Sequence, residues 1–305
     1  MNSKELKNDN YSISVIIPNF NRKEPLIRAI KSVLSQTYSV KEIIIVDDNS
    51  EYDAKKFLQE NFFLEYENGF IKLFVNEQNY GCAKSRNVGI KRSNSNFIAL
   101  LDSDDVWQST KLEKQINKFK KNQLLDLVYC DQFIIENDKK VNWGKMINNN
   151  ILDHLIDFWA PPSPSTLLFK KKSLEKIGNF NEEIGRSGSD HYLWFRLAIE
   201  KLNIDFVNEP LCDYIIDGVD RTSYNLKNRI ASIKVLLSKI KDYIPKEKNF
   251  FFRNKYICNV SLYILTNELK QKNFSKVSFI YLRYLMFNIF FYKRLFEKTK
   301  KLFNN

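Results

Sequence analysis

The sequence has few of the residues that build metal cages, disulfide frameworks or flexible linkers. Its 305 residues include two histidines and four cysteines, and no two cysteines form a C-x-x-C pair. A zinc site is therefore not expected, and no disulfide framework is indicated. Eight glycines and seven prolines are too few for a collagen-like or linker-dominated chain.

The N-terminal segment also lacks an apolar core. Residues 1–11 are polar, so they form an N-terminal tail and do not resemble a signal peptide. A reducing cytoplasm is the compartment that we expect. Apolar residues make up 44% of the chain, which excludes wholesale disorder and suffices for a large α/β domain.

The net charge of +12 is concentrated at the C-terminal end. Residues 225–305 contain 18 lysines and arginines against four acidic residues, a charge of +14, and the remainder of the chain carries −2. A nearly neutral body therefore carries a strongly basic tail. This asymmetry favours an anionic partner for the tail, with a membrane surface and nucleic acid as the two candidates.

The first part of the chain, residues 12–131, alternates between strand and helix patterns. Short apolar runs predict buried parallel strands at 12–17, 42–46, 70–75, 97–101 and 125–130. Helices are predicted from Pro25 and over about 53–61, 82–92 and 109–121. This rhythm predicts a doubly wound, mostly parallel sheet with helices on both faces.

The rest of the chain divides into a second half, 132–222, and a basic, aromatic, helical C-terminal region, 223–305. The second half is less regular and contains the loop residues Pro161-Pro162-Ser163-Pro164. A strand is predicted at 165–169, and helices at 172–178 and about 189–201.

Carboxylates follow two of the predicted strands, as Asp47-Asp48-Asn49-Ser50 and Asp102-Ser103-Asp104-Asp105. Ligands of such sheets bind outside the carboxyl ends of the strands. Asp102 and Asp104 share one face of an extended segment, and two such carboxylates favour a bound Mg²⁺ or Mn²⁺. An acidic turn that caps the helix near Ser109 is the simpler alternative.

Several motifs together, in this order and spacing, resemble the nucleotide-sugar domain of family 2 glycosyltransferases. They are SVIIPNFNR, EIIIVDDNS, NYGCAKSRNVGI, FIALLDSDDVW, PSTLLFKKKSLEKIGNFNEE and GSDHYLWFRLA. The resemblance covers about residues 12–210 and implies a GT-A fold. It also implies that 12–131 bind the nucleotide-sugar and that 132–222 bind the acceptor.

The resemblance implies a set of donor-binding residues, namely Pro18, Phe20, Asn21, Asp48, Arg86, Asn87, Asp102 and Ser103. An aromatic ring such as that of Phe20 can stack on uracil, and Asp48 matches the acidic residue that accepts a hydrogen bond from the base. Asp48 could instead cap the helix near 53–61, although Asn49 or Ser50 can do so. Arg86 and Asn87 could belong to a solvated helix face.

The resemblance also implies the catalytic groups. Asp104 is the first choice for the metal, with Asp102 in the metal shell or near the ribose and Asp105 in support. Asp190 matches the general base, which takes the proton from the incoming hydroxyl. A single displacement inverts the anomeric carbon, and nothing in the sequence demands a nucleophile. Asp190 could instead cap its helix, and His191 is read as structural.

On the acceptor side the candidates are Ser165, Thr166 and Trp194. The two hydroxyls could bind acceptor hydroxyls or satisfy a strand edge, and Trp194 fits a core position better than a sugar platform. The family often has an Arg and a His near 213–217, where this chain has Asp-Tyr-Ile-Ile-Asp. Arg221 is a nearby substitute for contacts to the diphosphate.

The stretch 277–292 is apolar except for Ser278, Arg283 and Asn288. It is shorter than the roughly 20 residues that span a bilayer, and its basic and aromatic flanks suit a helix on an anionic membrane surface. The alternative is a small helical bundle or an interface in a homo-oligomer. No nucleic-acid-binding motif is visible.

The sequence thus predicts an inverting, metal-dependent glycosyltransferase, of hexosyltransferase type. Its donor is a nucleotide-diphospho-sugar, expected to be UDP-linked. Its acceptor is a hydroxyl of a glycan or lipid-linked molecule, in the synthesis of surface polysaccharide or glycoconjugate. We expect it in the cytoplasm, peripheral at the inner face of the cell membrane. The alternatives are a non-catalytic sugar-nucleotide or membrane-binding module, and a nucleotidyltransferase, although PNFNR lacks a glycine-rich phosphate loop.

Overall fold

The computed structural model describes residues 9–137, 139–142, 151–156, 161–184, 188–216 and 235–240, with a few single positions between 254 and 275. The chain forms two compact units that are interleaved in sequence. The first consists of residues 1–146, 162–182 and 200–219, and the second of residues 147–161, 183–199 and 220–305.

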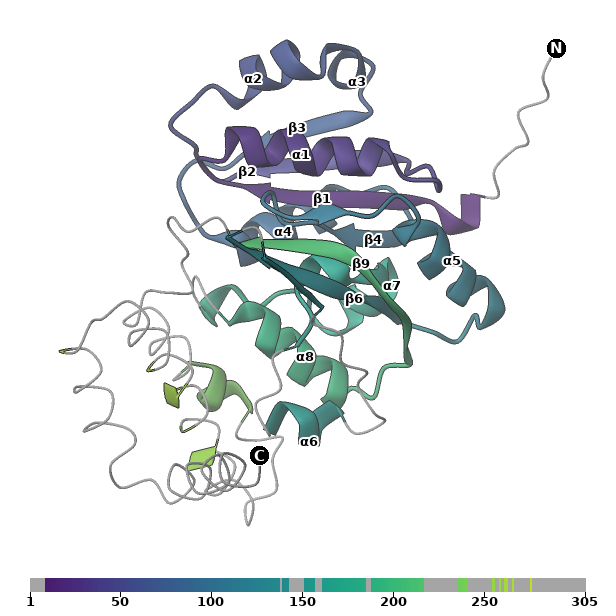
Figure 1. Ribbon diagram of the computed structural model, residues 1–305, viewed down its shortest axis with the longest axis vertical. Coiled ribbons are helices and arrows are strands. Elements are labelled where there is room, and N and C mark those ends of the chain that lie inside the picture. Colours follow the sequence, from purple (N-terminus) through teal and green to yellow (C-terminus); the bar gives the residue numbers. More distant parts are fainter. Residues whose placement is uncertain are drawn as a thin grey trace. The chain divides into compact units, whose positions relative to one another are not determined.

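The first unit is built on one mixed sheet with the strand order β3-β2-β1-β4-β8-β6-β9-β5, and β7 pairs with β6 (Figure 1). The strands β3, β2, β1 and β4 are parallel, and the antiparallel β8 separates β4 from β6. The strands are β1 (Ile13–Asn19), β2 (Glu42–Asp47), β3 (Ile71–Val75), β4 (Phe97–Leu100), β5 (Val106–Trp107), β6 (Leu127–Glu136), β7 (Lys139–Asn142), β8 (Leu168–Lys170) and β9 (Ile204–Ile216). The expected mostly parallel α/β sheet is confirmed.

Helices pack on both faces of the parallel strands, with α1 in front of β1 and α4 behind it in Figure 1. The α-helices of the first unit are α1 (Lys23–Leu34), α2 (Ala54–Asn61), α3 (Phe63–Glu67), α4 (Cys82–Arg92), α5 (Lys111–Lys121) and α7 (Lys171–Lys176). The second unit contains α6 (Ile151–Ile156) and α8 (Ser189–Ile199), and residues 235–240 are helical. Short 3-10 turns are η1 (Asp9–Tyr11), η2 (Pro164–Thr166) and η3 (Glu182–Ile184).

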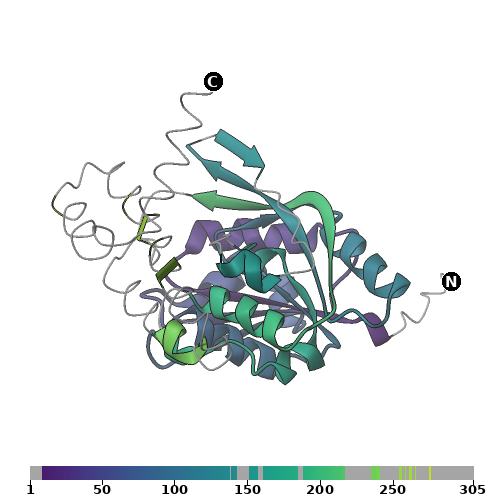
Figure 2. The ribbon, with the colours of Figure 1, turned by 90° about the horizontal axis from the view of Figure 1, so that it is seen from below.

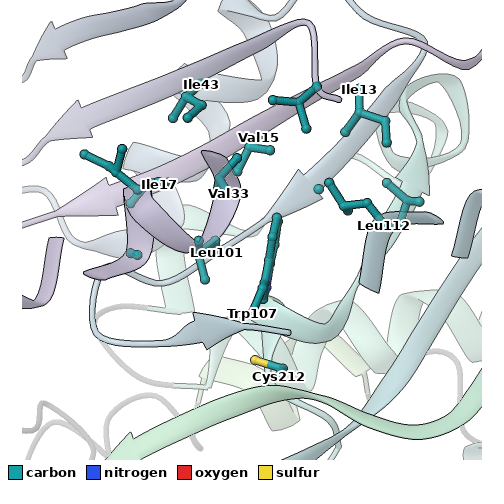
Figure 3. Packing of buried hydrophobic residues seen from close by; sticks show 14 of the residues in the cluster. Ile13, Val15, Ile17, Val33, Ile43, Leu101, Trp107, Leu112 and Cys212 are labelled. Carbon is teal, nitrogen blue, oxygen red and sulfur yellow. The ribbon is translucent and has the colours of Figure 1, made fainter. Parts of the chain in front are cut away.

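Successive side chains of β1 point to opposite faces of the sheet, one covered by α1 and the other by α4. Ile13, Val15 and Ile17 join the core that α1 covers (Figure 3). Ile16 points to the other face, where α4 approaches so closely that a Cβ added to Gly89 would lie 2.4 Å from Ile16 Cγ2. Glycine at this position therefore allows α4 to lie against the sheet.

A buried carboxylate ties together the N-terminal ends of the parallel strands. Glu42, at the start of β2, accepts hydrogen bonds from Ser14 of β1, Lys72 of β3 and the backbone N–H of Asn94 ahead of β4, at 2.6, 2.6 and 2.8 Å. Burial raises the pKa of Glu42, but these bonds and the Lys72 charge outweigh it, and the net shift is downward. The structural anchor of the sheet thus lies at the end opposite to the carboxylates of the candidate site.

The sequence pattern missed the strands β5, β7 and β9, of which β9 is the longest. Strand β9 runs for 13 residues and pairs in parallel with β6 (Figure 2). The register of this pair shifts around Asp131. Pro210 lies opposite Asp131 and has no backbone N–H to donate, which accounts for a break in the ladder at this point. The expected strand at 165–169 is shorter than predicted, because Ser165 and Thr166 belong to the turn η2.

Candidate functional site

The candidate site lies where the parallel strands β1, β2 and β4 end. Because these strands run in the same direction, the segments that follow them, residues 20–22, 48–50 and 101–105, meet at one edge of the sheet. Asn21 and Asn49 adopt left-handed φ angles of 53° and 65° in the turns that leave β1 and β2, a conformation that asparagine tolerates better than most residues. Two of the expected motifs, DDNS and DSDD, are therefore brought together by the fold.

Asp48 fastens the loop that precedes α4. Its Oδ1 accepts from the Asn76 side chain at 2.7 Å and from the Tyr80 backbone N–H at 3.0 Å, and its Oδ2 accepts from Gly81 N–H at 2.6 Å. The residue is only 4% exposed. The alternative role of Asp48 as a helix cap is not seen, because Asp53 caps α2. Neither Asn49 nor Ser50 does so.

Of the three candidates on or after β1, Phe20 and Asn21 are exposed, and Phe20 is 42% exposed. Pro18 is buried within β1 opposite Val46. Asn21 braces two loops: its N–H donates to Ser50 Oγ, and its Oδ1 accepts from Glu51 N–H, each at 2.8 Å. The ring of Phe20 is thus available for stacking, whereas Asn21 is engaged within the protein.

A buried network beneath these loops was not predicted from sequence. Asn19 Nδ2 donates to Asp47 Oδ1 and to the hydroxyl of Tyr52, both at 2.8 Å. Asp47 also accepts from the backbone N–H and the hydroxyl of Ser50. The two neighbouring aspartates therefore differ in role, since Asp47 closes its own turn and Asp48 holds the loop before α4. The doubled aspartate was the only signal in the sequence.

The DSDD segment forms a tight turn that Ser165 holds from beneath. The N–H of Asp102 donates to Ser165 Oγ at 3.0 Å, and this hydroxyl donates to Asp105 Oδ2 at 2.5 Å. Trp107 Nε1 donates to the Ser165 carbonyl at 2.7 Å. Asp105 is fully buried, and burial, followed by the carboxylates of Asp104 and Asp102, raises its pKa well above the ordinary value.

The turn sorts its residues by exposure. The side chains of Asp102 and Asp104 are 23% and 22% exposed, while Ser103 and Asp105 are buried. Two carboxylates are thus presented at the surface of the strand end, and the third supports them from below. Asp102 and Asp104 are therefore the carboxylates of the turn that solvent reaches, and Asp105 is the one that it does not.

Each presented carboxylate has an arginine beside it. Arg86, buried in α4, places Nη2 2.5 Å from Asp102 Oδ1. Arg22, which precedes α1, places Nη1 3.6 Å from Asp104 Oδ2. Arg22 was not among the predicted site residues, although it follows the PNFN motif directly, and proximity to DSDD across more than 80 residues is invisible in sequence.

The side chain of Asn87 is bonded to residues 180 and 182, so it does not belong to a solvated helix face. Its amide hydrogens bond to the Phe180 carbonyl and to Glu182 Oε1, each at 2.8 Å, and its Oδ1 accepts from Phe180 N–H at 3.0 Å. The Phe180 ring in turn lies 5.0 Å from Cζ of Arg86. Asn87 therefore fastens the segment that packs against Arg86.

The acceptor-side hydroxyls are buried. Ser165 and Thr166 are 0% exposed, and the Thr166 hydroxyl donates to the Ser163 carbonyl at 2.8 Å. Gln115 donates to the Thr166 carbonyl. Both hydroxyls are thus engaged inside the protein, which favours the supporting role over contact with an acceptor.

Asp190 and Trp194 lie on α8, in the second unit. Asp190 is in the first turn of the helix and is partly exposed, and no other described residue forms a hydrogen bond or ion pair with its carboxylate. Trp194 is completely buried, as expected for a core residue. A partly exposed carboxylate without a described partner is free to act as a base.

The basic tail lies almost entirely outside the described residues, as does Arg221. Among the described residues, no helix is long and apolar enough to cross a membrane. The predictions for residues 274–305 therefore rest on sequence alone.

Known proteins resemble the chain in both sequence and fold. It is 36% identical over 150 residues to the UDP-Glc:alpha-D-GlcNAc-diphosphoundecaprenol beta-1,3-glucosyltransferase WfgD of Escherichia coli, covering 46% of this chain and 57% of that protein. It is 30% identical over 288 residues to an uncharacterized glycosyltransferase of Rickettsia conorii, covering 84% of this chain and 46% of that protein. The chain thus spans about half the length of these two relatives.

Among solved structures, TarS of S. aureus (residues 1–349) in complex with UDP-GlcNAc matches with a TM-score of 0.63. It is 16% identical, and the match covers 86% of this chain and 76% of that one. At this identity the likeness concerns the fold, which is GT-A. The model of glycosyl transferase family 2 matches residues 14–195, more than half of the chain. The chain therefore belongs to glycosyl transferase family 2.

Proposed function

We propose that this chain transfers a sugar from a UDP-sugar to a hydroxyl of a glycan or lipid-linked acceptor, with inversion at the anomeric carbon. Family membership supports glycosyl transfer over nucleotidyl transfer. WfgD is named for a UDP-linked glucose donor and a diphosphoundecaprenol-linked acceptor, and TarS has been solved with UDP and with UDP-GlcNAc. Both support the choice of donor and acceptor class.

The single observation that carries the proposal is the arrangement of the DSDD turn. Asp102 and Asp104 are presented at a strand end, with Asp105 buried beneath them. Among the described residues, no group of three or more His, Cys, Asp or Glu could hold a metal ion alone. The two carboxylates of Asp102 and Asp104 fit Mg²⁺ or Mn²⁺, because these ions are often held by one or two carboxylates together with the substrate phosphates.

In the proposed mechanism, Asp104 and Asp102 hold the cation. When bound, it acts as a Lewis acid that stabilises charge on the departing UDP. Asp48 recognises the base. A carboxylate can accept about four hydrogen bonds, and Asp48 accepts three of them from Asn76, Tyr80 and Gly81. The fourth fits the N–H of uracil, and the exposed ring of Phe20 fits its face.

Asp190 is the proposed general base. It takes the proton from the acceptor hydroxyl as that oxygen attacks the anomeric carbon, and the bond to UDP breaks in the same displacement. This assignment rests on the motif at 188–198 and on the partly exposed carboxylate at the start of α8. The basic tail supports a peripheral location at an anionic membrane, where a lipid-linked acceptor is found.

A panel of nucleotide-sugars tests the proposal. The wild-type protein is expected to hydrolyse one UDP-sugar slowly and only with Mn²⁺ or Mg²⁺ present. Asp104→Asn should abolish metal-dependent donor binding while the melting temperature stays unchanged. Asp53→Asn is the matched control, because it makes the same charge change at an exposed helix cap that asparagine also satisfies. Unchanged metal dependence in Asp104→Asn would show that the metal assignment is wrong.

A further inference from the structure

Strand β6 carries an aspartate at the same level of the sheet as the DSDD turn. Leu127 of β6 is level with Ile98 of β4, because both residues lie opposite Phe169 of β8. Both strands are antiparallel to β8, so they run in the same direction, and four residues further along them come Asp131 and Asp102. With β8 between them, the backbones of β4 and β6 are about 10 Å apart.

Asp131 therefore lies beyond the DSDD turn, on the side away from the residues proposed to bind the base. Phe20 and Asp48 follow β1 and β2, and the DSDD turn follows β4. In the strand order β2-β1-β4-β8-β6, these groups and Asp131 form a row. In the proposed function this row begins at the base and continues to the diphosphate. A group that binds beside Asp131 is thus expected to belong to a sugar.

The carboxylate of Asp131 is buried without a partner. The residue is 7% exposed, and no described residue forms a hydrogen bond or an ion pair with its side chain. Its two neighbours on β6 differ in this respect. Cys130 Sγ lies 3.8 Å from the Thr166 carbonyl oxygen. Gln132 Oε1 accepts from Ser163 N–H at 3.1 Å. Burial raises the pKa of Asp131 above its ordinary value, which means that the ionised carboxylate destabilises the fold.

This carboxylate is nevertheless open to a ligand, because the protein does not fully enclose its oxygens. Within the part of the chain that the structure describes, no group of three or more His, Cys, Asp or Glu could hold a metal ion, so Asp131 belongs to no such cluster. An ionised carboxylate accepts strong hydrogen bonds from hydroxyl groups. A hydroxyl donor is therefore the ligand chemistry that fits Asp131.

We propose that Asp131 binds a hydroxyl of the acceptor sugar and so contributes to the choice of acceptor. The inference rests on the proposed function, and it adds a contact on β6 to the groups that follow β1, β2 and β4. The acceptor sugar is assigned because Asp131 lies two strand positions beyond the carboxylates proposed to face the diphosphate. The hydrogen bond offsets the hydration that the carboxylate loses on burial. No covalent bond is made or broken in this contact.

Acceptor binding to Asp131→Asn tests the contact. The probe is N-acetylglucosamine linked through a diphosphate to a short lipid, and its binding is measured by calorimetry with UDP and Mn²⁺ present. The amide keeps the shape of the side chain but makes no charge-assisted bond, so the affinity for this probe should fall about tenfold. The affinity for UDP-glucose, measured with Mn²⁺ and without the probe, should stay at the wild-type value.

Thermal unfolding at neutral pH gives a readout that does not depend on any ligand. Asp131→Asn removes an unpaired buried charge, so its melting temperature should rise by about 2–4 °C. Asp126→Asn is the matched control, because Asp126 precedes the same strand and its carboxylate has partners. It accepts from Ser173 Oγ at 2.6 Å and from Asn203 N–H at 2.9 Å. This control should melt at a lower temperature than wild type and bind the probe equally well.

The two readouts separate a ligand-binding role from a structural one. A melting temperature that falls in Asp131→Asn, as in Asp126→Asn, would show that Asp131 supports the fold, and the inference would be refuted. If Asp131→Asn binds the probe as tightly as wild type does, the inference is refuted while the proposed function stands. Weaker binding of UDP-glucose, with binding of the probe unchanged, would place the hydroxyl on the transferred sugar and refute the acceptor assignment. Wild-type protein that binds UDP but not the probe would overturn the proposed acceptor class together with this inference.

Discussion

The guanidinium of Arg86 lies 2.5 Å from the carboxylate of Asp102, and the ring of Phe180 lies 5.0 Å from its Cζ. Three segments that are far apart in sequence meet in this contact. Asn87, the next residue on α4, bonds to both the N–H and the carbonyl of Phe180. The residues around 180 therefore set the position of Arg86, and through it the orientation of Asp102.

Arg86→Lys is expected to weaken UDP-sugar binding about tenfold, measured by calorimetry with Mn²⁺ present. Lysine keeps the charge, but it has neither the planar group that packs on Phe180 nor the fork that orients a carboxylate. Arg92→Lys is the control, because Arg92 lies on the same helix with its Cζ 5.0 Å from the Phe74 ring. Equal donor affinity in both variants would show that Arg86 does not position Asp102 for the donor.

Ser165→Ala is expected to lower the free energy of unfolding by about 2–3 kcal/mol, because two buried groups of the DSDD turn lose a hydrogen-bond partner. Urea denaturation measures this, and Mn²⁺ affinity should fall with it. Thr166→Val, which removes only a bond to the Ser163 carbonyl, should cost about 1 kcal/mol. An unchanged stability together with a raised KM for the acceptor would instead place Ser165 in the acceptor site.

Glu42→Gln is expected to destabilise the fold by about 2–3 kcal/mol at neutral pH, because bonds to an ionised carboxylate are lost. The pKa of Glu42 is lowered in the folded state, so its stabilising effect is present above the ordinary glutamate pKa. It disappears as the pH falls through the lowered pKa.

Urea denaturation between neutral and acidic pH tests the sign of this effect. The difference in the free energy of unfolding between wild type and Glu42→Gln should shrink as the solution becomes more acidic. A difference that stays constant or grows on acidification would contradict the lowered pKa.

Asp190→Asn should bind the donor as wild type does and transfer it about 10²–10⁴-fold more slowly, because the amide keeps the shape and removes the basicity. Single-turnover kinetics with a UDP-sugar and an acceptor measure the loss. Asp53→Asn again provides the matched charge change. A loss of less than about tenfold would mean that another residue is the base.

Removal of residues 274–305 should release the protein from anionic vesicles. This segment contains seven lysines and arginines against Glu297, and each basic residue near an anionic surface contributes about 1 kcal/mol. Flotation of full-length and truncated protein at low and high salt measures the effect, with neutral vesicles as the control. If the full-length protein stays in the soluble fraction, or the truncation unfolds the protein or dissociates an oligomer, the bundle or interface alternative is favoured.

The sequence by itself determined the parallel part of the sheet and the place of the site. Apolar runs predicted β1, β2, β3 and β4 to within a few residues, and α4 matched the expected 82–92. These elements follow local rules, since burial on both faces requires continuous apolar strands and a helix repeats every 3.6 residues. The carboxylates after β2 and β4 then had to meet at one edge, because parallel strands end together.

Tertiary structure alone decided what each polar side chain does there. Sequence did not show that Asp47 closes its own turn while Asp48 holds the loop before α4. Nor did it place Arg22 beside Asp104, or show that Ser165 holds the DSDD turn from beneath. It also missed β9, whose ladder with β6 is interrupted at Pro210. The reason is physical: a hydrogen bond depends on distances of about 3 Å between segments far apart in the chain, and burial decides which groups must be paired.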